Sequence, residues 1–436
     1  MKSKVYSSVE QFKEQNAELK TDLPISDDNS VLCQKVKIGN LELSNRLVCQ
    51  AMEGCDGTAD GRPDELTVRR YERLSKGGAG LIWFEATAVC NEGRANPRQL
   101  YINEKNLDDF KKIVENIKQR GMKENGYEPA VIMQATHSGR YSKPEGKPAP
   151  IIAYNNPIFE KDNPIDKSRI ITDEGLDRVH ESLVHAAGLA KEAGFDGVDI
   201  KCCHRYLNSE LLSAFTREGR YGGSFENRTR LLRESVRDSI SLCGDGFTVT
   251  SRMNVYDGFP YPYGFGVKEG EGITPDFSEA DRLIKELAEL GVKLLDITMG
   301  NPYFNPHVNR PYAAGGYEPP EHPLCGVARM LKGTAKLGKA NPDVSLICSG
   351  LSFLGTAAPG VAAAFIEEGG FSLAGFGRMI FAYPDFAKDI VNGRFDPKKI
   401  CIACSKCTEI MRAGGTPGCI VRDGETYMPI YKKYCK

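Results

Sequence analysis

The feature that most constrains the fold of this 436-residue chain is an alternation of short apolar segments with amphipathic ones. The apolar segments have the length of buried strands, and the segments between them show helical periodicity. Eight such strand-then-helix units in succession predict an α/β fold, the (β/α)8 TIM barrel. The expected strands are residues 47–52, 80–86, 130–135, 197–201, 247–253, 294–299, 344–349 and 373–377, and clear helical patterns include 65–76, 107–119, 176–193, 227–242, 279–290 and 360–368.

Three regions are expected along the chain. A short polar N-terminal arm covers residues 1–30, with a helical pattern from 9 to 19, the barrel covers 31–395, and a small cysteine-rich C-terminal segment covers 396–436. A doubly wound open sheet is the competing fold, but no G-x-G-x-x-G pattern follows the first strand. The stretches 136–169 and 301–323 are rich in polar residues and Pro, and we expect them to be βα loops at the C-terminal face, where substrate walls lie.

Composition and charge narrow the class of function. A formal net charge of −1, with acids and bases interspersed, offers no electrostatic basis for binding nucleic acid or an anionic membrane. The apolar runs are shorter than the roughly 20 residues that a membrane span needs, and no secretory leader is expected. Fourteen cysteines, several inside strand-like runs, indicate reduced thiols in a cytoplasmic protein.

Four cysteines are concentrated near the end of the sequence. Cys401, Cys404 and Cys407 are separated by two residues each, and an eleven-residue gap leads to Cys419. Two-residue gaps let successive sulfurs converge on one point, as a four-thiolate site requires. The spacing predicts an inorganic site without choosing between zinc and an iron–sulfur cluster.

Two glycine-containing turns follow the last two expected strands. One carries Ser349 and Gly350, and the other carries Gly377 and Arg378. In barrels, the loops after these strands bind phosphate through backbone N–H groups and a helix N-terminus. The glycines would allow close approach of the backbone, and Arg378 adds a fixed charge. Glycines that serve only tight turns are the alternative.

Several motifs together resemble the Old Yellow Enzyme family, in the family's order over residues 31–392. The cysteine segment makes the chain similar to the branch of 2,4-dienoyl-CoA reductase and trimethylamine dehydrogenase. This resemblance implies FMN in the barrel and a [4Fe–4S] cluster, in preference to zinc, on Cys401, Cys404, Cys407 and Cys419. The motifs are Leu43-Ser44-Asn45-Arg46, Gln134-Ala135-Thr136-His137-Ser138-Gly139-Arg140 and Arg220-Tyr221-Gly222-Gly223-Ser224-Phe225-Glu226-Asn227-Arg228.

The resemblance also implies roles in flavin binding. Gln134 matches the glutamine that hydrogen-bonds the pyrimidine edge of the flavin. Arg252 matches the arginine near flavin N1 and O2, where a cation stabilises the charge of the reduced ring. An internal salt bridge is the alternative for this arginine. The backbone of Ala51 and Met52 matches the segment along the isoalloxazine, although the family often has Pro at position 51.

The family's substrate clamp is His-x-x-His or His-x-x-Asn, followed by Gly-Tyr-Leu. Here Lys201 stands at the first clamp position, His204 at the second and Tyr206 at that of the proton-donating tyrosine, while Arg205 replaces the glycine. We therefore expect Lys201 and His204 to bind the substrate oxygen that gains charge. The alternative is that Lys201 reaches solvent or pairs with a carboxylate.

Three further residues are assigned by position. Tyr303 and His307 lie in the loop after the sixth strand and are candidates for the substrate wall, with an ordinary loop scaffold as the alternative. His137 is expected to have a structural role in its turn.

The resemblance predicts an FMN- and [4Fe–4S]-dependent ene reductase. Hydride would pass to the β-carbon of an unsaturated carbonyl or carboxylate compound, and Tyr206 would protonate the α-carbon. Electrons would come from NAD(P)H directly, or through the cluster from a separate ferredoxin, flavoprotein or reductase subunit. We favour the second route, because a cluster close to FMN has an evident use as a one-electron relay.

Two other functions stay open at this point. An amine dehydrogenase or demethylase would send electrons outward through the cluster, but Lys201 would repel a cationic amine. A non-catalytic electron-transfer flavoprotein subunit would have no need of a proton donor. The sequence does not specify the alkene or the oligomeric state, and a homo-oligomer stays open.

Overall fold

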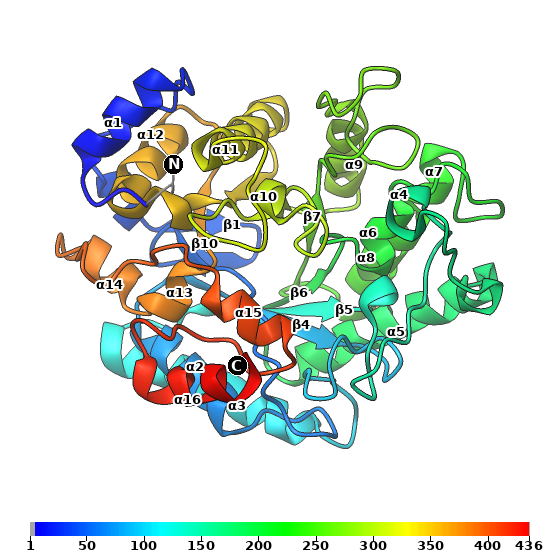
Figure 1. The fold of residues 1–436 in the computed structure, drawn as a ribbon. Helices are drawn as coiled ribbons and strands as arrows, with labels where there is room; N and C mark the ends of the chain where they lie inside the picture. The colour runs from blue at the N-terminus through cyan, green and yellow to red at the C-terminus, as the bar shows by residue number, and fades with distance from the viewer. Residues whose placement is uncertain (1–4, 436) are drawn as a thin grey trace.

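Eight parallel strands close into a barrel in the computed structural model, which describes residues 5–435 (Figure 1). The order around the barrel is β10-β3-β4-β5-β6-β7-β8-β9, so the last strand pairs with the first and leaves no open edge. The predicted fold class is confirmed, and each expected strand overlaps an observed one. The strands are β3 (Leu47–Cys49), β4 (Leu81–Ala88), β5 (Ala130–Thr136), β6 (Gly197–Ile200), β7 (Thr248–Asn254), β8 (Leu294–Thr298), β9 (Ser345–Cys348) and β10 (Leu373–Phe376).

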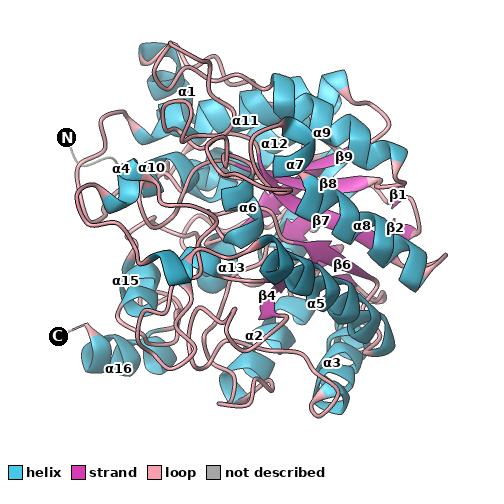
Figure 2. Ribbon diagram, turned by 90° about the vertical axis from the view of Figure 1, so that its right-hand side faces the viewer, coloured by secondary structure: helices cyan, strands magenta, loops and turns pink. Residues whose placement is uncertain are grey.

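Helices surround the strands, as Figure 2 shows. None of the helices within residues 5–435 combines the length and the apolar character that a bilayer crossing demands. The longer helices around the barrel are α2 (Glu65–Lys76), α3 (Leu107–Asn125), α5 (Asp173–Glu192), α8 (Arg230–Cys243), α9 (Ser278–Glu289), α11 (Pro323–Ala340) and α12 (Ala358–Glu367). The shorter ones are α4 (Pro157–Glu160), α6 (Leu207–Leu211), α7 (Phe225–Arg228), α10 (Pro306–Asn309), α13 (Met379–Ala382) and α14 (Phe386–Val391).

The N-terminal end of the barrel is closed by a hairpin. Its strands, β1 (Val36–Ile38) and β2 (Leu41–Leu43), pair antiparallel, and their apolar side chains join those of the barrel interior in one buried cluster that includes Trp83. This apolar packing fills the N-terminal end of the barrel, and the βα loops lie at the opposite end, where the active sites of such barrels form.

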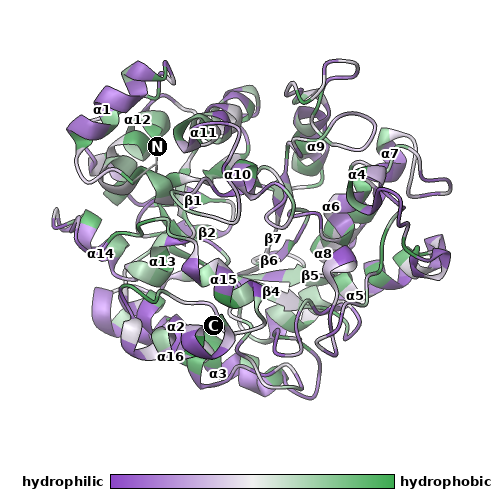
Figure 3. Ribbon diagram, viewed as in Figure 1, coloured by the Kyte–Doolittle hydropathy of each residue, from purple (hydrophilic) through white to green (hydrophobic). Residues whose placement is uncertain are grey.

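The N-terminal arm packs on the outside of the barrel. Its helix α1 (Val9–Glu18) buries Phe12, which packs edge-to-face against Tyr6. The backbone N–H of Ser26 donates to the carbonyl of Gly360 in α12, and a Cβ at Gly360 would meet the Ser26 carbonyl oxygen at 2.6 Å. Figure 3 shows that α12 is largely hydrophobic, which agrees with its burial beneath the arm.

The C-terminal segment is held against the barrel by charge. It contains α15 (Lys406–Arg412) and α16 (Gly424–Tyr434), and Figure 1 shows α16 beside α2. The largely buried carboxylate of Asp423 pairs with Arg69, at 2.8 Å, and with Arg73, both on α2. This docking places the cysteines at the C-terminal face of the barrel.

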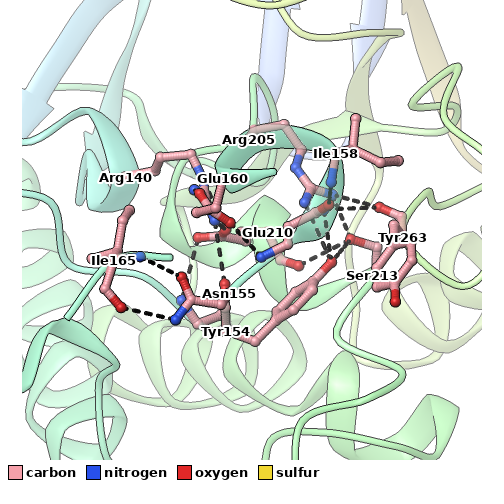
Figure 4. Close-up of polar contacts among 12 residues, drawn as sticks. Arg140, Tyr154, Asn155, Ile158, Glu160, Ile165, Arg205, Glu210, Ser213 and Tyr263 are labelled. Carbon is pink, nitrogen blue, oxygen red and sulfur yellow. Dashed lines mark hydrogen bonds and ion pairs between the residues drawn. The ribbon is translucent and has the colours of Figure 1, made fainter. Parts of the chain in front are cut away.

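A buried ionic network connects the loops on the other side of that face (Figure 4). The Arg205 guanidinium is fully buried and lies 2.9 Å from Asp257, and it also donates to the hydroxyl of Ser213. Arg205 has φ +58, in the left-handed region where a glycine is unstrained. Arginine at this position therefore strains the backbone but supplies the cation that holds these loops together.

Candidate active site

One large cavity opens at the C-terminal end of the strands. It encloses about 1000 Å³ with its open mouth, enough for a nucleotide cofactor and a small substrate together. The strands position its walls from several sides, because their carboxyl ends meet at this face. The expected residues that line it are Ala51, Met52, Gln134, Lys201, His204, Tyr206, Arg252, Tyr303, Ser349, Gly350, Gly377 and Arg378.

Two buried aspartates position the expected flavin-edge residues from behind. Asp199 accepts from the Gln134 amide at 2.6 Å and from the backbone N–H of Arg252 at 2.7 Å. The Arg252 guanidinium pairs with Asp296 at 3.0 Å, which is the internal salt bridge given as the alternative, and Arg252 also lines the cavity. Burial raises the pKa of Asp296 to about 7, and Arg252 opposes that rise.

The expected phosphate site contains an unsatisfied cation. Arg378 is 7% exposed, one of its terminal nitrogens donates to the Pro311 carbonyl, and Nη1 is buried without a hydrogen-bond partner in the described protein. A buried guanidinium nitrogen of this kind suits an anionic group such as the FMN phosphate. Gly350 has φ +98, so its backbone takes a conformation that favours glycine.

A second arginine lines the same part of the cavity and was not singled out by the sequence. Burial and the nearby Arg378 lower the pKa of Arg310 to about 10. Its Nη1 donates to the Ser405 hydroxyl at 3.3 Å. Arg310 lies in the long loop after β8, and no sequence pattern indicates which residues of such a loop face the cavity.

The expected substrate residues form the opposite wall. Lys201 is 4% exposed, and its Nζ lies 3.8 Å from the centroid of the Tyr206 ring, so it does not reach solvent. Burial, Arg252 and Lys201 hold the pKa of His204 well below its usual value, which leaves a neutral imidazole. The hydroxyl of Tyr206 lies 2.9 Å from that of Tyr303.

The structure does not bring His307 into the cavity. Its Nδ1 lies 2.5 Å from the hydroxyl of Tyr317, within the same loop, and the side chain is absent from the cavity walls. The short helix α10 turns it away, so the expectation that it contacts substrate is not supported by the geometry.

His137 lies outside the cavity as well, in the turn after β5. Its Nδ1 accepts from the backbone N–H of Gly139 at 3.1 Å, and burial lowers the pKa of His137 to about 4. The ring is therefore neutral and carries its hydrogen on Nε2. This geometry agrees with a structural role for His137.

Sequence reasoning missed Glu53. This residue follows β3 and lines the cavity, with Oε2 3.3 Å from the Tyr206 hydroxyl. Burial raises the pKa of Glu53, and Lys201 counteracts that rise. The signal that could have found it is a charged residue just beyond the end of a barrel strand, where catalytic residues concentrate.

The four cysteines of the C-terminal segment line a second, smaller cavity. Arg378, Phe381 and Cys407 belong to the walls of both cavities, so the two sites are adjacent. Backbone N–H groups point at two of the sulfurs: that of Ala403 lies 3.4 Å from Cys401 Sγ, and that of Arg422 lies 3.3 Å from Cys419 Sγ. Such donors favour thiolate ligands.

The four cysteine sulfurs are not gathered as closely as the ligands of a single metal ion. Within residues 5–435, a group of three His, Cys, Asp or Glu ligand atoms within 4.8 Å of one another occurs at Cys90, Glu92 and His137, and not among these cysteines. The group of Cys90, Glu92 and His137 is poorly suited to a metal. His137 Nδ1 already accepts from a backbone N–H, so the hydrogen is on Nε2, the nitrogen left to bind a metal.

The sequence matches known proteins over most of the barrel. The profile of the NADH:flavin oxidoreductase / NADH oxidase family matches residues 32–396. An NADPH dehydrogenase of Geobacillus sp. (strain WCH70) is 30% identical over 276 residues, which are 62% of this chain and 73% of that protein.

Solved structures share the fold. A 2-naphthoyl-CoA reductase in complex with 2-naphthoyl-CoA aligns with a TM-score of 0.73 and 22% identity, over 93% of this chain and 58% of that one. Histamine dehydrogenase from Rhizobium sp. 4-9 aligns with a TM-score of 0.68 and 21% identity, over 90% of this chain and 52% of that protein. The chain thus spans little more than half the length of these two proteins, and their likeness concerns the fold alone.

Proposed function

Because the chain belongs to the NADH:flavin oxidoreductase / NADH oxidase family, we propose that it reduces a C=C bond conjugated to a carbonyl or carboxylate, with FMN and a [4Fe–4S] cluster as cofactors. The family match covers nearly the same residues as the resemblance to the Old Yellow Enzymes, which it confirms. The observation that carries the proposal is that Lys201, His204 and Tyr206 face the same cavity as Gln134 and Arg252.

The cavity residues fit FMN. Gln134 and Arg252 would bind the pyrimidine edge, and Gly350, Gly377 and Arg378 would bind the phosphate, which the unpartnered Arg378 Nη1 favours. When bound, FMN supplies a hydride to carbon.

The protein's own groups supply polarisation and a proton. Lys201 and His204 would donate hydrogen bonds to the substrate oxygen as its negative charge grows, in a cavity where burial strengthens such interactions. Tyr206 would transfer its hydroxyl proton to the α-carbon. The protonated product then leaves, and Tyr206 must be reprotonated before the next cycle.

The cysteine geometry supports iron–sulfur over zinc. Four thiolates around one zinc lie about 3.8 Å apart, because each Zn–S bond is about 2.3 Å. The sulfurs of Cys401, Cys404, Cys407 and Cys419 do not gather within 4.8 Å in threes. A four-iron cluster would bind each thiolate at a different iron, so it would not require the sulfurs to gather that closely.

An oxidative reaction on a cationic amine is the second candidate, and one observation weighs against it. Aromatic rings of Tyr141, Tyr206 and Tyr303 lie together in this part of the protein, as an amine site requires. The Lys201 ammonium already lies over the Tyr206 ring, so a substrate cation would meet a like charge there.

The substitution Tyr206→Phe tests the proposal. We expect oxidation of the anaerobically photoreduced flavin by 2-cyclohexen-1-one or trans-cinnamate to slow by about 10² to 10⁴-fold, because the proton donor is lost. Stopped-flow absorbance measures this rate. The matched control is Tyr221→Phe, which removes a buried tyrosine hydroxyl bonded to Asp177 outside the cavity. Equal rates in the two variants would rule out Tyr206 as the donor.

A further inference from the structure

The backbone around Glu53 is fixed by a buried ionic cluster. The N–H of Gly54 donates to a Glu85 carboxylate oxygen at 2.7 Å, and Arg70 pairs with both Glu85 and Asp56. A Cβ at Gly54 would meet the Arg70 guanidinium at 2.3 Å, so only glycine fits beside Glu53. These contacts fix the backbone next to Glu53, whose side chain lines the cavity.

Glu53 contacts the tyrosine that the proposed reaction deprotonates. Its Oε2 lies 3.3 Å from the Tyr206 hydroxyl, which in turn lies 2.9 Å from the Tyr303 hydroxyl. We propose that Glu53 is the proton store of the site and returns a proton to Tyr206 after each protonation of substrate.

The charged and titratable groups that face Glu53 favour this role. They are Lys201 beyond β6, the hydroxyls of Tyr206 and Tyr303, and the thiol of Cys55. Burial raises the pKa of both tyrosines and of Cys55 far above neutrality, whereas a carboxyl starts low, and burial lifts its pKa toward the working range. Among these groups in contact with Tyr206, Glu53 is thus the one whose proton is given up most readily.

The proton balance is simple. The O–H bond of Tyr206 breaks, and its proton forms the new C–H bond at the α-carbon, which leaves a tyrosinate. The O–H bond of the Glu53 carboxyl then breaks and restores the Tyr206 hydroxyl. The resulting Glu53 carboxylate, stabilised by the Lys201 ammonium, takes a proton from water that enters the cavity. No further oxidant or reductant is involved.

This inference rests on the proposed function, and two substitutions in the full-length holoenzyme separate them. Glu53→Gln keeps the shape but carries no acidic proton, and Glu53→Asp keeps the acid on a shorter side chain. With 2-cyclohexen-1-one as probe, we expect turnover of Glu53→Gln to fall at least 10-fold. Wild-type turnover should decline in one step as the pH rises through the pKa of Glu53, and Glu53→Gln should lack that step. Glu53→Asp should retain that step. Infrared difference spectra should show a protonated carboxyl band in wild type that is absent in Glu53→Gln.

The outcomes are distinguishable. If Tyr206→Phe is slow and Glu53→Gln matches wild type, the proton store is refuted and the ene reductase stands. If Glu53→Gln is slowed equally at every pH, with the pH profile unchanged, Glu53 is only structural and the inference fails. If Tyr206→Phe is unimpaired, the proposed function fails and the proton store with it.

Discussion

At the scale of single residues, the departure that matters most is Lys201 in place of the family histidine. A lysine on a long flexible stem is a poor positioning group unless something restrains it. Here burial and the Tyr206 ring do so, since Nζ lies 3.8 Å from the ring centroid. The cavity thereby gains a fixed cation beside the neutral His204, which suits a substrate whose oxygen becomes negative.

Removal of this cation should weaken binding of the activated substrate. We expect Lys201→Met to lower kcat/KM for trans-cinnamate by about 10- to 100-fold, the size of a lost hydrogen bond to a charged group. Burial lowers the pKa of Lys201, so the ammonium is lost at a lower pH than in a free lysine. Wild-type kcat/KM should therefore fall as the pH rises through that pKa.

Steady-state kinetics across pH measure both effects. Lys201→Met should lack this alkaline decline, and Lys201→His should keep part of the activity. Unchanged kinetics in both variants would remove Lys201 from the site.

At the scale of elements, loops that surround the cavity are joined by the Arg205 network. Arg205 is in the left-handed conformation just before α6, and its partners come from the segments around Tyr154 and Asp257 (Figure 4). The strain of such a backbone costs about 1–3 kcal/mol. Restoration of the family glycine would relieve it but would leave Asp257 buried without its cation.

The lost ion pair should outweigh the relieved strain. We expect Arg205→Gly to destabilise the holoenzyme by about 3–5 kcal/mol, because one buried charge loses its partner. Addition of Asp257→Asn should recover part of this loss. Urea unfolding measures both, and Arg237→Ala, which removes an exposed arginine paired with Asp238, should change the free energy of unfolding by less than about 1 kcal/mol. A stable Arg205→Gly would contradict this account.

The helix α11 is difficult to predict from the sequence pattern alone. Its sequence contains Gly326, Gly333 and Gly338, which lower helix propensity and blur the periodicity. Tertiary contacts explain two of them: a Cβ at Gly333 would meet Met299 at 2.5 Å, and one at Gly338 would meet the Gly370 carbonyl oxygen at 2.1 Å. Packing thus selects glycines that local propensity disfavours.

At the scale of the whole molecule, the C-terminal segment connects two expected cofactor sites. The docking of Asp423 on α2 brings the cysteine cavity against the large cavity, so that Cys407 belongs to both. We propose that electrons from a separate carrier enter here, one at a time, through the cluster. NADH alone in anaerobic stopped-flow should then reduce the flavin only slowly, and rapid bleaching would overturn this route.

Loss of one expected ligand should separate the two cofactors. We expect Cys407→Ser to lower the iron content per protein markedly while FMN stays bound, because the expected FMN contacts come from the barrel. Iron analysis and the flavin absorbance measure this. Cys435→Ser, in the same segment but outside the cysteine cavity, is the control and should keep its iron. Zinc in place of iron in oxygen-free preparations would refute the cluster.

The sequence by itself determined the barrel, because eight alternating units allow few other arrangements. Its motifs, through the family resemblance, also named about half of the residues that line the cavity, and the convergence of the carboxyl ends of barrel strands explains why they meet. Tertiary structure decided what local pattern does not encode. Loop conformation turned His307 onto Tyr317 and brought Arg310 into the cavity, and the buried Arg70 cluster fixed Glu53 beside Tyr206. These placements depend on contacts between segments far apart in the chain, which no single stretch of residues specifies.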